Sequence, residues 1–470
     1  MKEFKSFKLI LVIILIIGSS LYVNSFFVSG IVSEDMTPLI DNVLLYSENS
    51  LIDGMDSGWK AVYGSLAYNS NDYVTSNAFL IGIPTTSGSE KLRIQKTFTT
   101  PLNLLRCNIG FWIKTSGTIP TDFSFYVETY DTSNKVRQWR YYQLGPRLQG
   151  SNNVWSHHFV VSTDYSYEST IDMTRISKIL FKFMVSTSNW TISIDDLRAY
   201  PNQELFPNGA VILTFDGPYE GAYNWAEPKL DQYNYTGVIA TARANLVGKP
   251  TIEQHLSVLY AKGWDICVYG RLFDNIDPTK YLPAATIAEN TLAEKAWLES
   301  KGFTRSSSFL HCNRHLLDVY TEDLLDDNFY FIKGGHWLAS NPIAFPSLAF
   351  NGISTSFEKD MAGIEKAAAT KTLYIWFNHL DQGTYTLAYT RTQFNAIVDR
   401  IHALGMEVLT YSQLLEKYTQ YLYATSPHLT VQLSVNGYSV TENGVVTNFN
   451  NAEELLAYLK IRFNQWEAIP

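Results

Sequence analysis

Short apolar runs separated by polar clusters dominate the chain from residue 42 to residue 200. The runs combine aromatic and β-branched residues, and the clusters between them consist of Gly, Asn, Asp, Ser and Thr. Runs of this length and spacing are typical of the strands of a β-sandwich or jelly roll. The clearest predicted strands cover residues 107–113, 123–128, 155–161, 179–185 and 190–194. We therefore expect a β-sandwich over residues 40–200.

A different pattern begins after the breaker-rich linker 201–209. Continuous apolar runs alternate there with stretches of helical periodicity, and Thr251 and Thr390, each followed three positions later by Gln, predict two capped helix starts. The predicted strands cover residues 210–214, 237–241, 264–268, 307–310, 329–332, 372–377 and 406–410. Seven strands alternating with helices predict a distorted (β/α) seven-stranded barrel over residues 208–418, in which ligands meet the carboxyl ends of the strands. Residues 425–470 predict a small α+β appendage, to which the sequence assigns no function.

The first 33 residues combine a basic start with a long uncharged stretch. Lys2, Lys5 and Lys8 precede an apolar run, and no further charged residue occurs before Glu34. This is the pattern of a secretory signal peptide, and at about 20 residues the stretch is also long enough to remain as a membrane anchor. Under both alternatives the positive-inside rule places the rest of the chain on the extracellular face of the cell membrane, or outside the cell after cleavage.

Composition narrows the range of partners. The 470 residues carry a formal net charge of −9, which argues against nucleic acid because such binding needs clustered Lys and Arg. The 30 Tyr and 11 Trp residues are suited to stacking on sugar rings, although sandwich cores also use them. Cys267 and Cys312 fall in the same predicted domain, where they could form a disulfide or remain two buried thiols.

Two adjacent carboxylates lie at the end of the predicted sandwich. The closing phrase, residues 192–200, resembles the last strand of many carbohydrate-binding jelly-roll modules, whose acidic residues help to hold a structural calcium ion. Asp195 and Asp196 are the corresponding candidates. The alternative is a pair of carboxylates in a strand-end turn that faces solvent.

Titratable residues follow several of the predicted barrel strands, at the end of the barrel where this fold places its ligands. They are Asp216, Tyr269, His311, His336 and His379. Asp216 comes directly after an apolar strand, so partial burial could raise its pKa and suit it to general-base chemistry. The alternative is that Asp216 caps the helix that follows.

The region 208–418 resembles the polysaccharide deacetylase family in the order and spacing of several phrases. They are Leu213-Thr214-Phe215-Asp216, Tyr219-Glu220-Gly221-Ala222-Tyr223, Ala261-Lys262-Gly263-Trp264-Asp265-Ile266, Phe377-Asn378-His379-Leu380 and Gly405-Met406-Glu407-Val408-Leu409-Thr410. The resemblance implies a barrel in which the Asp of the first phrase is the general base and a late His is the general acid. It also implies that a second Asp and a His-x-x-x-His pair hold a divalent metal that activates water.

Carried over residue by residue, the resemblance assigns the general base to Asp216 and the general acid to His379. The three metal-ligand positions fall on Gly217, Tyr269 and Phe273. Glycine and phenylalanine have no donor atom and neutral tyrosine is a poor ligand, so we expect no metal site of the family's type and no other cofactor at this site. The residues expected to line the substrate groove are Tyr219, Tyr269, His311 and Trp337.

Three functional hypotheses remain. In the first, the chain is a deacetylase-like protein whose catalysis has decayed and which binds polysaccharide or cell-wall glycan. In the second, it is a rewired hydrolase that removes N- or O-acetyl groups from a glycan, using Asp216 and His379 with His311, His315 and His336 nearby. In the third, it is a surface adhesion or structural protein whose working part is the β-sandwich.

Overall fold

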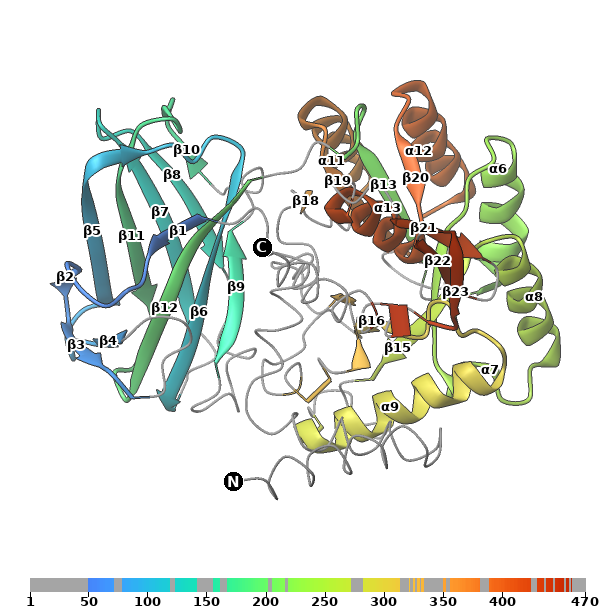
Figure 1. Cartoon of the computed structure of the whole chain (residues 1–470), viewed down its shortest axis with the longest axis horizontal. Coiled ribbons are helices and arrows are strands. Elements are labelled where there is room, and N and C mark those ends of the chain that lie inside the picture. Colours follow the sequence, from blue (N-terminus) through green and yellow to red (C-terminus); the bar gives the residue numbers. More distant parts are fainter. Residues whose placement is uncertain are drawn as a thin grey trace, which may run out of the picture.

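The chain forms a β-sandwich and a half-barrel that lie side by side in the computed structural model (Figure 1). The structure describes residues 50–71, 78–118, 123–141, 155–160, 167–201, 205–215, 219–271, 282–312, 321, 324–325, 328–329, 331–333, 350–351, 356–380, 389–423, 429–434, 437–442, 444–451, 454–455 and 458.

The β-sandwich consists of two antiparallel sheets, which we call sheet A and sheet B. Sheet A has the order β3 (Ser65–Asn69), β4 (Phe79–Ile83), β12 (Trp190–Pro201), β6 (Cys107–Gly117) and β9 (Ser156–Val160), with β1 (Ser50–Asp53) paired to β12. Sheet B has the order β10 (Tyr167–Glu168), β8 (Val136–Tyr141), β7 (Ser124–Asp131), β11 (Ile176–Met184), β5 (Glu90–Leu102) and β2 (Lys60–Tyr63). All five strands predicted from the sequence are present, and the predicted sandwich is confirmed.

The core of the sandwich is aromatic. The ring of Phe111, from sheet A, lies 5.7 Å from that of Phe125 and 5.1 Å from that of Phe181, both from sheet B, in edge-on contacts. These residues are fully buried because alternate side chains of each strand point to the other sheet. Many of the aromatic residues of the chain therefore serve this core.

The second part is built on a parallel sheet, sheet C. Its order is β17 (Phe331–Lys333), β16 (Phe309–Cys312), β15 (Asp265–Gly270), β14 (Val238–Thr241), β13 (Ala210–Phe215), β19 (Leu373–Asn378) and β18 (Phe350–Asn351), with β20 (Glu407–Leu409) also paired to β13. All seven predicted strands are present and parallel; the two-residue β18 was not predicted. The pairs among the described residues form a parallel half-barrel, and a complete seven-stranded barrel is not confirmed.

Helices cover the convex face of sheet C. They are α5 (Tyr219–Gly221), the π-helix η1 (Ala222–Ala226), α6 (Glu227–Asp231), α7 (Arg243–Leu246), α8 (Pro250–Ala261), α9 (Ala284–Ser300), α11 (Phe357–Thr370) and α12 (Arg391–Ala403). The predicted capping box at Thr390 is confirmed, with Gln393 as its partner. The predicted cap at Thr251 is wrong: α8 begins one residue earlier, at Pro250, whose ring has no N–H to satisfy and suits the first turn.

The concave face of sheet C is covered by α13 (Tyr411–Tyr423) and by a small antiparallel sheet of β21 (Leu429–Ser434), β22 (Gly437–Glu442) and β23 (Val445–Phe449). Tyr438 and Val440 of β22 share one buried apolar cluster with Ile212 and Ile375 of sheet C. Burial raises the pKa of Tyr438 well above its ordinary value. The appendage therefore fills the open side of the half-barrel. Cys267 is fully buried in the same cluster. The side chain of Cys312 lies outside the described residues, so the two alternatives for this pair stay open.

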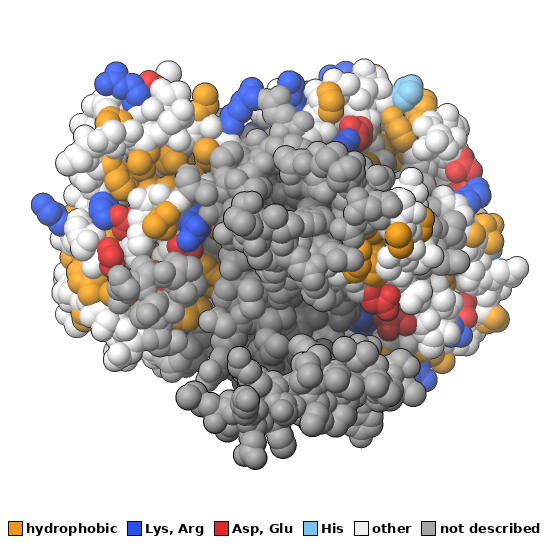
Figure 2. Space-filling model, viewed as in Figure 1, with side chains coloured by type: hydrophobic (Ala, Val, Ile, Leu, Met, Phe, Trp, Pro, Cys, Tyr) orange, Lys and Arg blue, Asp and Glu red, His pale blue; other side chains and the backbone are white. Residues whose placement is uncertain are grey.

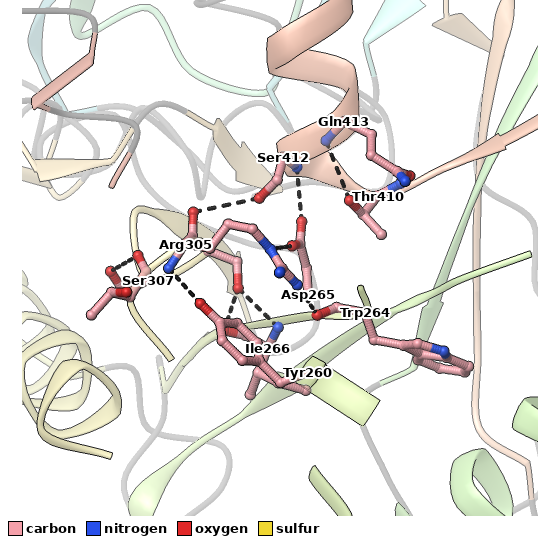
Figure 3. A network of polar contacts seen from close by, with 11 residues as sticks. Tyr260, Trp264, Asp265, Ile266, Arg305, Ser307, Thr410, Ser412 and Gln413 are labelled. Atoms are coloured by element: carbon pink, nitrogen blue, oxygen red, sulfur yellow. Dashed lines mark hydrogen bonds and ion pairs between the residues drawn. The ribbon is translucent and has the colours of Figure 1, made fainter. Parts of the chain in front are cut away.

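A buried polar network lies at the amino ends of β15 and β16 and at the start of α13 (Figure 3). The Nε of Arg305 donates to the carboxylate of Asp265 at 3.1 Å, and both side chains are almost completely buried. Arg305 also donates to the carbonyl of Trp264, and its guanidinium lies 4.3 Å from the centre of the Tyr260 ring. The second carboxylate oxygen of Asp265 accepts from the backbone N–H of Ser412 at 2.8 Å, which satisfies the first turn of α13. The network ties sheet C to the helix that leads into the appendage.

The surface drawn in Figure 2 carries acidic and basic side chains interspersed with hydrophobic and other residues on both described parts. None of the helices within the described ranges is long and apolar enough to cross a bilayer. The segment 1–33, for which a leader or an anchor is predicted, lies outside those ranges.

Candidate functional site

The strands that precede Asp216 and His379 in the sequence end side by side at one corner of the half-barrel. Strands β13 and β19 pair in parallel, and the last pair in their register joins Phe215 to Asn378. In the sequence, Asp216 directly follows Phe215, and His379 directly follows Asn378. Asp216 lies outside the described residues, so its role stays a prediction.

The chain beyond Asp216 returns to the same corner. A Cβ atom added to Gly221 would lie 2.1 Å from the carbonyl oxygen of Leu380, so only a glycine allows the two backbones to come this close. Leu380 directly follows His379. Phe215 and Gly221, which flank Asp216 in the sequence, are therefore held against Asn378 and Leu380, which flank His379.

His379 is half-buried and its backbone is fixed by the segment that follows. The carbonyl of His379 accepts from the backbone N–H of Tyr389 at 2.9 Å, and Leu380 forms an isolated parallel bridge with Tyr389. The imidazole lies edge-on to the ring of Phe377 at 5.7 Å. These contacts close the loop after β19 at its base.

A buried carboxylate anchors this closure from the convex side. Asp360 of α11 accepts from the hydroxyl of Tyr389 and from that of Tyr374, each at 2.6 Å. Burial and the bond to Asp360 both raise the pKa of Tyr389, so its hydroxyl keeps the proton that it donates. Because Tyr389 also holds the backbone of His379, Asp360 acts on the position of that histidine.

The inner face of the half-barrel near this corner is filled by aromatic rings. We call Tyr269, His311 and Phe377, which come from β15, β16 and β19, the mouth cluster. The imidazole of His311 is fully buried, with ring centres 6.2 Å from Tyr269 and 5.0 Å from Phe377. The structure thus brings together Tyr269 and His311, two of the four predicted groove residues.

The other two predicted groove residues are placed differently. Tyr219 is 7% exposed, and its hydroxyl donates to the carbonyl of Ala240 at 3.2 Å and accepts from Asn245 at 2.9 Å. Its ring belongs to the core beneath the corner. Trp337 lies outside the described residues, as do His315 and His336.

The residues at the metal positions of the deacetylase pattern do not fit a divalent metal. Gly217 and Phe273, which supply no donor atom, lie outside the described residues, and Tyr269 packs in the mouth cluster. Within the described ranges, no three His, Cys, Asp or Glu side chains gather as a metal site would require.

The calcium candidates lie on a bulge of β12. Asp196 has a positive φ of 52°, and its carboxylate holds the Nε of Arg198 at 2.7 and 2.9 Å. The carboxylate of Asp195 is fully buried and accepts from the N–H of Asp196 at 2.8 Å. The carboxylate of Asp196 thus already has a cationic partner, and calcium binding here stays a prediction.

Comparison with known proteins gives likenesses for each part of the chain. No family model matches the chain, and no curated protein matches it. Among solved structures, 33% of the chain is similar to 96% of a family 11 carbohydrate-binding module from Clostridium thermocellum, at 12% identity and a TM-score of 0.25. The peptidoglycan deacetylase PdaC from Bacillus subtilis matches 47% of the chain over 96% of its own length, at 13% identity and a TM-score of 0.33. The Xyl-CE4 domain of a xylanase from the hindgut metagenome of Trinervitermes trinervoides matches 45% of the chain over 92% of its own length, at 17% identity and a TM-score of 0.30. At this level of identity and TM-score, these likenesses assign neither a family nor an activity to this chain.

Sequence reasoning missed Asp360 and its two tyrosine donors. The signal was present: Asp360 lies on the same side of α11 as Ile364 and Ala367, which are buried. A carboxylate on the apolar side of an amphipathic helix needs donors, because burying it unpaired is costly. The donors themselves come from other elements, and local periodicity does not indicate them.

We expect Gly221→Ala to destabilise the corner by about 1–3 kcal/mol, because the added methyl group would overlap the backbone of Leu380. The measurement is urea unfolding followed by tryptophan fluorescence. Asn224→Ala, at an exposed position of the neighbouring η1, is the matched control and should change stability by no more than about 0.5 kcal/mol. Equal effects of the two substitutions would disprove the close approach.

Proposed function

We propose that the protein is a glycan-binding protein of the cell surface or extracellular space, whose half-barrel does not use the metal-dependent chemistry of the deacetylases that it resembles. The observation that carries this proposal is the mouth cluster. Where the deacetylase pattern calls for imidazole ligands and an open metal position, Tyr269 packs with the fully buried His311 and with Phe377. Removing the ligands removes the activated water on which such catalysis depends.

The extracellular location in this proposal rests on the basic, apolar start of the sequence. Sugar binding rests on the exposed tyrosines Tyr63, Tyr68 and Tyr167 of the sandwich, since the flat face of such a ring stacks on a sugar ring while its hydroxyl stays hydrated.

The first test combines metal analysis with an activity assay on the full-length protein. We expect purified protein to contain no stoichiometric zinc, nickel or cobalt, and to release no acetate from acetylated chitin or peptidoglycan fragments, with or without added metal. Polysaccharide pull-down should nevertheless show binding. Metal-dependent acetate release would refute the proposal.

A second candidate function is a rewired, metal-independent hydrolase, which the corner geometry favours. Asp216 would take a proton from a water molecule while the oxygen of that water attacks the carbonyl carbon of the acetyl group. His379 would then protonate the leaving nitrogen or oxygen of the sugar as the bond to the acetyl carbon breaks, releasing acetate. In this mechanism Tyr219 and Asp360 act only through the segments that they hold.

If this second function holds, Asp216→Asn is expected to lower turnover by about 10²–10⁴-fold with little change in stability. Acetate release per enzyme and the thermal unfolding midpoint are the two measurements. Asp56→Asn, at an exposed position of the sandwich, serves as the control and should leave turnover unchanged. Unchanged turnover in Asp216→Asn would show that the base is assigned wrongly.

A further inference from the structure

A row of cationic and aromatic side chains crosses the outer face of sheet B. Tyr63 of β2 is opposite Arg93 of β5, Arg93 is opposite Lys182 of β11, Lys182 is opposite Tyr126 of β7, and Tyr126 is opposite Arg140 of β8. Directly opposite residues of antiparallel strands lie on the same face, and strands are about 4.8 Å apart, so the row is about 19 Å long.

The cations of this row lie over the aromatic rings. The centre of the Tyr126 ring is 5.0 Å from Nζ of Lys182 and 5.1 Å from Cζ of Arg140, and Arg93 lies 5.0 Å from the ring centre of Tyr63. A cation–π contact uses the negative face of the ring and occupies no N–H donor with a lone pair. The ring of Tyr126 therefore fixes the position of Lys182 without using the N–H donors of its ammonium group.

Two further cations extend the face on either side of its centre. Lys178, opposite Tyr130, lies 3.7 Å from the centre of that ring, and Lys60 is opposite Gln95 at the edge. Among the described residues, five cations of this face stand against two carboxylates. The two carboxylates are those of Glu90 and Glu128. Glu90 forms an ion pair with Arg93, and Glu128 accepts hydrogen bonds from the side chains of Tyr130 and Gln138. The chain as a whole carries a charge of −9, so this face has the opposite sign.

We propose that the outer face of sheet B is a binding site for an anionic polysaccharide. This inference rests on the proposed glycan binding and adds the charge of the ligand. Carboxylate or sulfate groups of the glycan would bind Lys182 and Lys178, and a sugar ring would stack on Tyr63, which is 47% exposed. The carboxylates of Glu90 and Glu128 on the same face oppose the dense phosphates of a nucleic acid.

The test compares charged and neutral glycans on the full-length protein. Binding to polygalacturonate, dextran sulfate, unmodified dextran and double-stranded DNA is measured by titration at low and at high salt. We expect one or both anionic polysaccharides to bind more tightly than dextran and DNA, with affinity that falls as salt rises. If only polygalacturonate binds, the group that the protein recognises is a carboxylate; if only dextran sulfate binds, it is a sulfate.

Substitutions then locate the site. Lys182→Gln and Lys178→Gln are each expected to weaken binding of the anionic polysaccharide about tenfold, since each removes one charge-assisted contact. Arg175→Gln, at an exposed position of the sandwich outside this row, should leave binding unchanged. Thermal midpoints of all variants check that the sandwich remains folded.

Several outcomes would overturn this inference. If dextran binds as tightly as the anionic polysaccharides, the protein still binds glycans, but the inference that its ligand is anionic is wrong. Unchanged affinity in Lys182→Gln and Lys178→Gln would place the site elsewhere. Tighter binding of DNA than of any glycan would show that the ligand is a nucleic acid. Absence of binding to every glycan tried, neutral or charged, would refute both proposals.

Discussion

Arg305→Ala is expected to lower the free energy of unfolding by about 3–5 kcal/mol, because it leaves the carboxylate of Asp265 charged and buried without its cation. Asp265 is 0% and Arg305 1% exposed, so water does not replace the lost partner. The same substitution removes the donor to the Trp264 carbonyl and the contact with the Tyr260 ring. Urea unfolding followed by tryptophan fluorescence measures the loss, with Trp264 as a reporter inside the barrel core.

The control is an ion pair of the same kind on the surface. Arg400 and Glu365 pair at 2.8 Å with both side chains about half exposed, so Arg400→Ala should cost no more than about 1 kcal/mol. Replacing Arg305 by Met and Asp265 by Leu together should recover part of the loss, since no buried charge remains. Recovery should be incomplete because the N–H of Ser412 still loses its acceptor. Equal losses for Arg305→Ala and Arg400→Ala would show that the network does not stabilise the barrel.

The strands of both parts could be predicted from the sequence because each is a local run with clear ends. The apolar stretch at Ala210 and the alternating stretch at Phe123 carry this signal within a few residues. The two-residue β18 has too little sequence to be recognised, and the start of α8 was misplaced because a capping-box pattern at Thr251 competed with Pro250. Local periodicity thus predicted the elements and missed short or ambiguous boundaries.

The closure of the half-barrel could not be predicted in the same way. Residues 428–440 indicated a strand, but nothing in that stretch shows that Tyr438 and Val440 pack against Ile212, more than 200 positions earlier. The corner at Asp216 and His379 was predicted from the strand ends, and the register of Phe215 with Asn378 supports it. Asp360, Arg305 and Asp265 depend on donors and acceptors from distant elements, which a single sequence does not indicate.

A chain that ends at Tyr423 is expected to lose the folded half-barrel. The appendage buries Tyr438, Val440, Phe449 and Leu455 against α13 and the concave face of sheet C. Full burial of such a side chain contributes roughly 1.5–3 kcal/mol, so the four together contribute about 6–12 kcal/mol. A typical domain has a total stability of about 5–15 kcal/mol, so the remaining sheet would be marginal or unfolded. The truncated chain should bind a hydrophobic dye, be cleaved readily by protease within residues 205–423, and keep the unfolding transition of the sandwich.

Point substitutions in the appendage test whether its packing, and not only the presence of the segment, stabilises the half-barrel. Leu455→Ala, at a fully buried position of the appendage, should cost about 2–5 kcal/mol and lower the midpoint of the barrel transition only. Val445→Ala, on the exposed end of β23 with 66% of the side chain accessible, should change the free energy of unfolding by no more than about 0.5 kcal/mol. If the truncated chain and Leu455→Ala both keep the barrel transition of the intact protein, the appendage does not support the half-barrel. Since α13 joins the appendage to the Asp265–Arg305 pair, loss of the appendage should also expose that pair to solvent, so Arg305→Ala should add little further loss in the truncated chain.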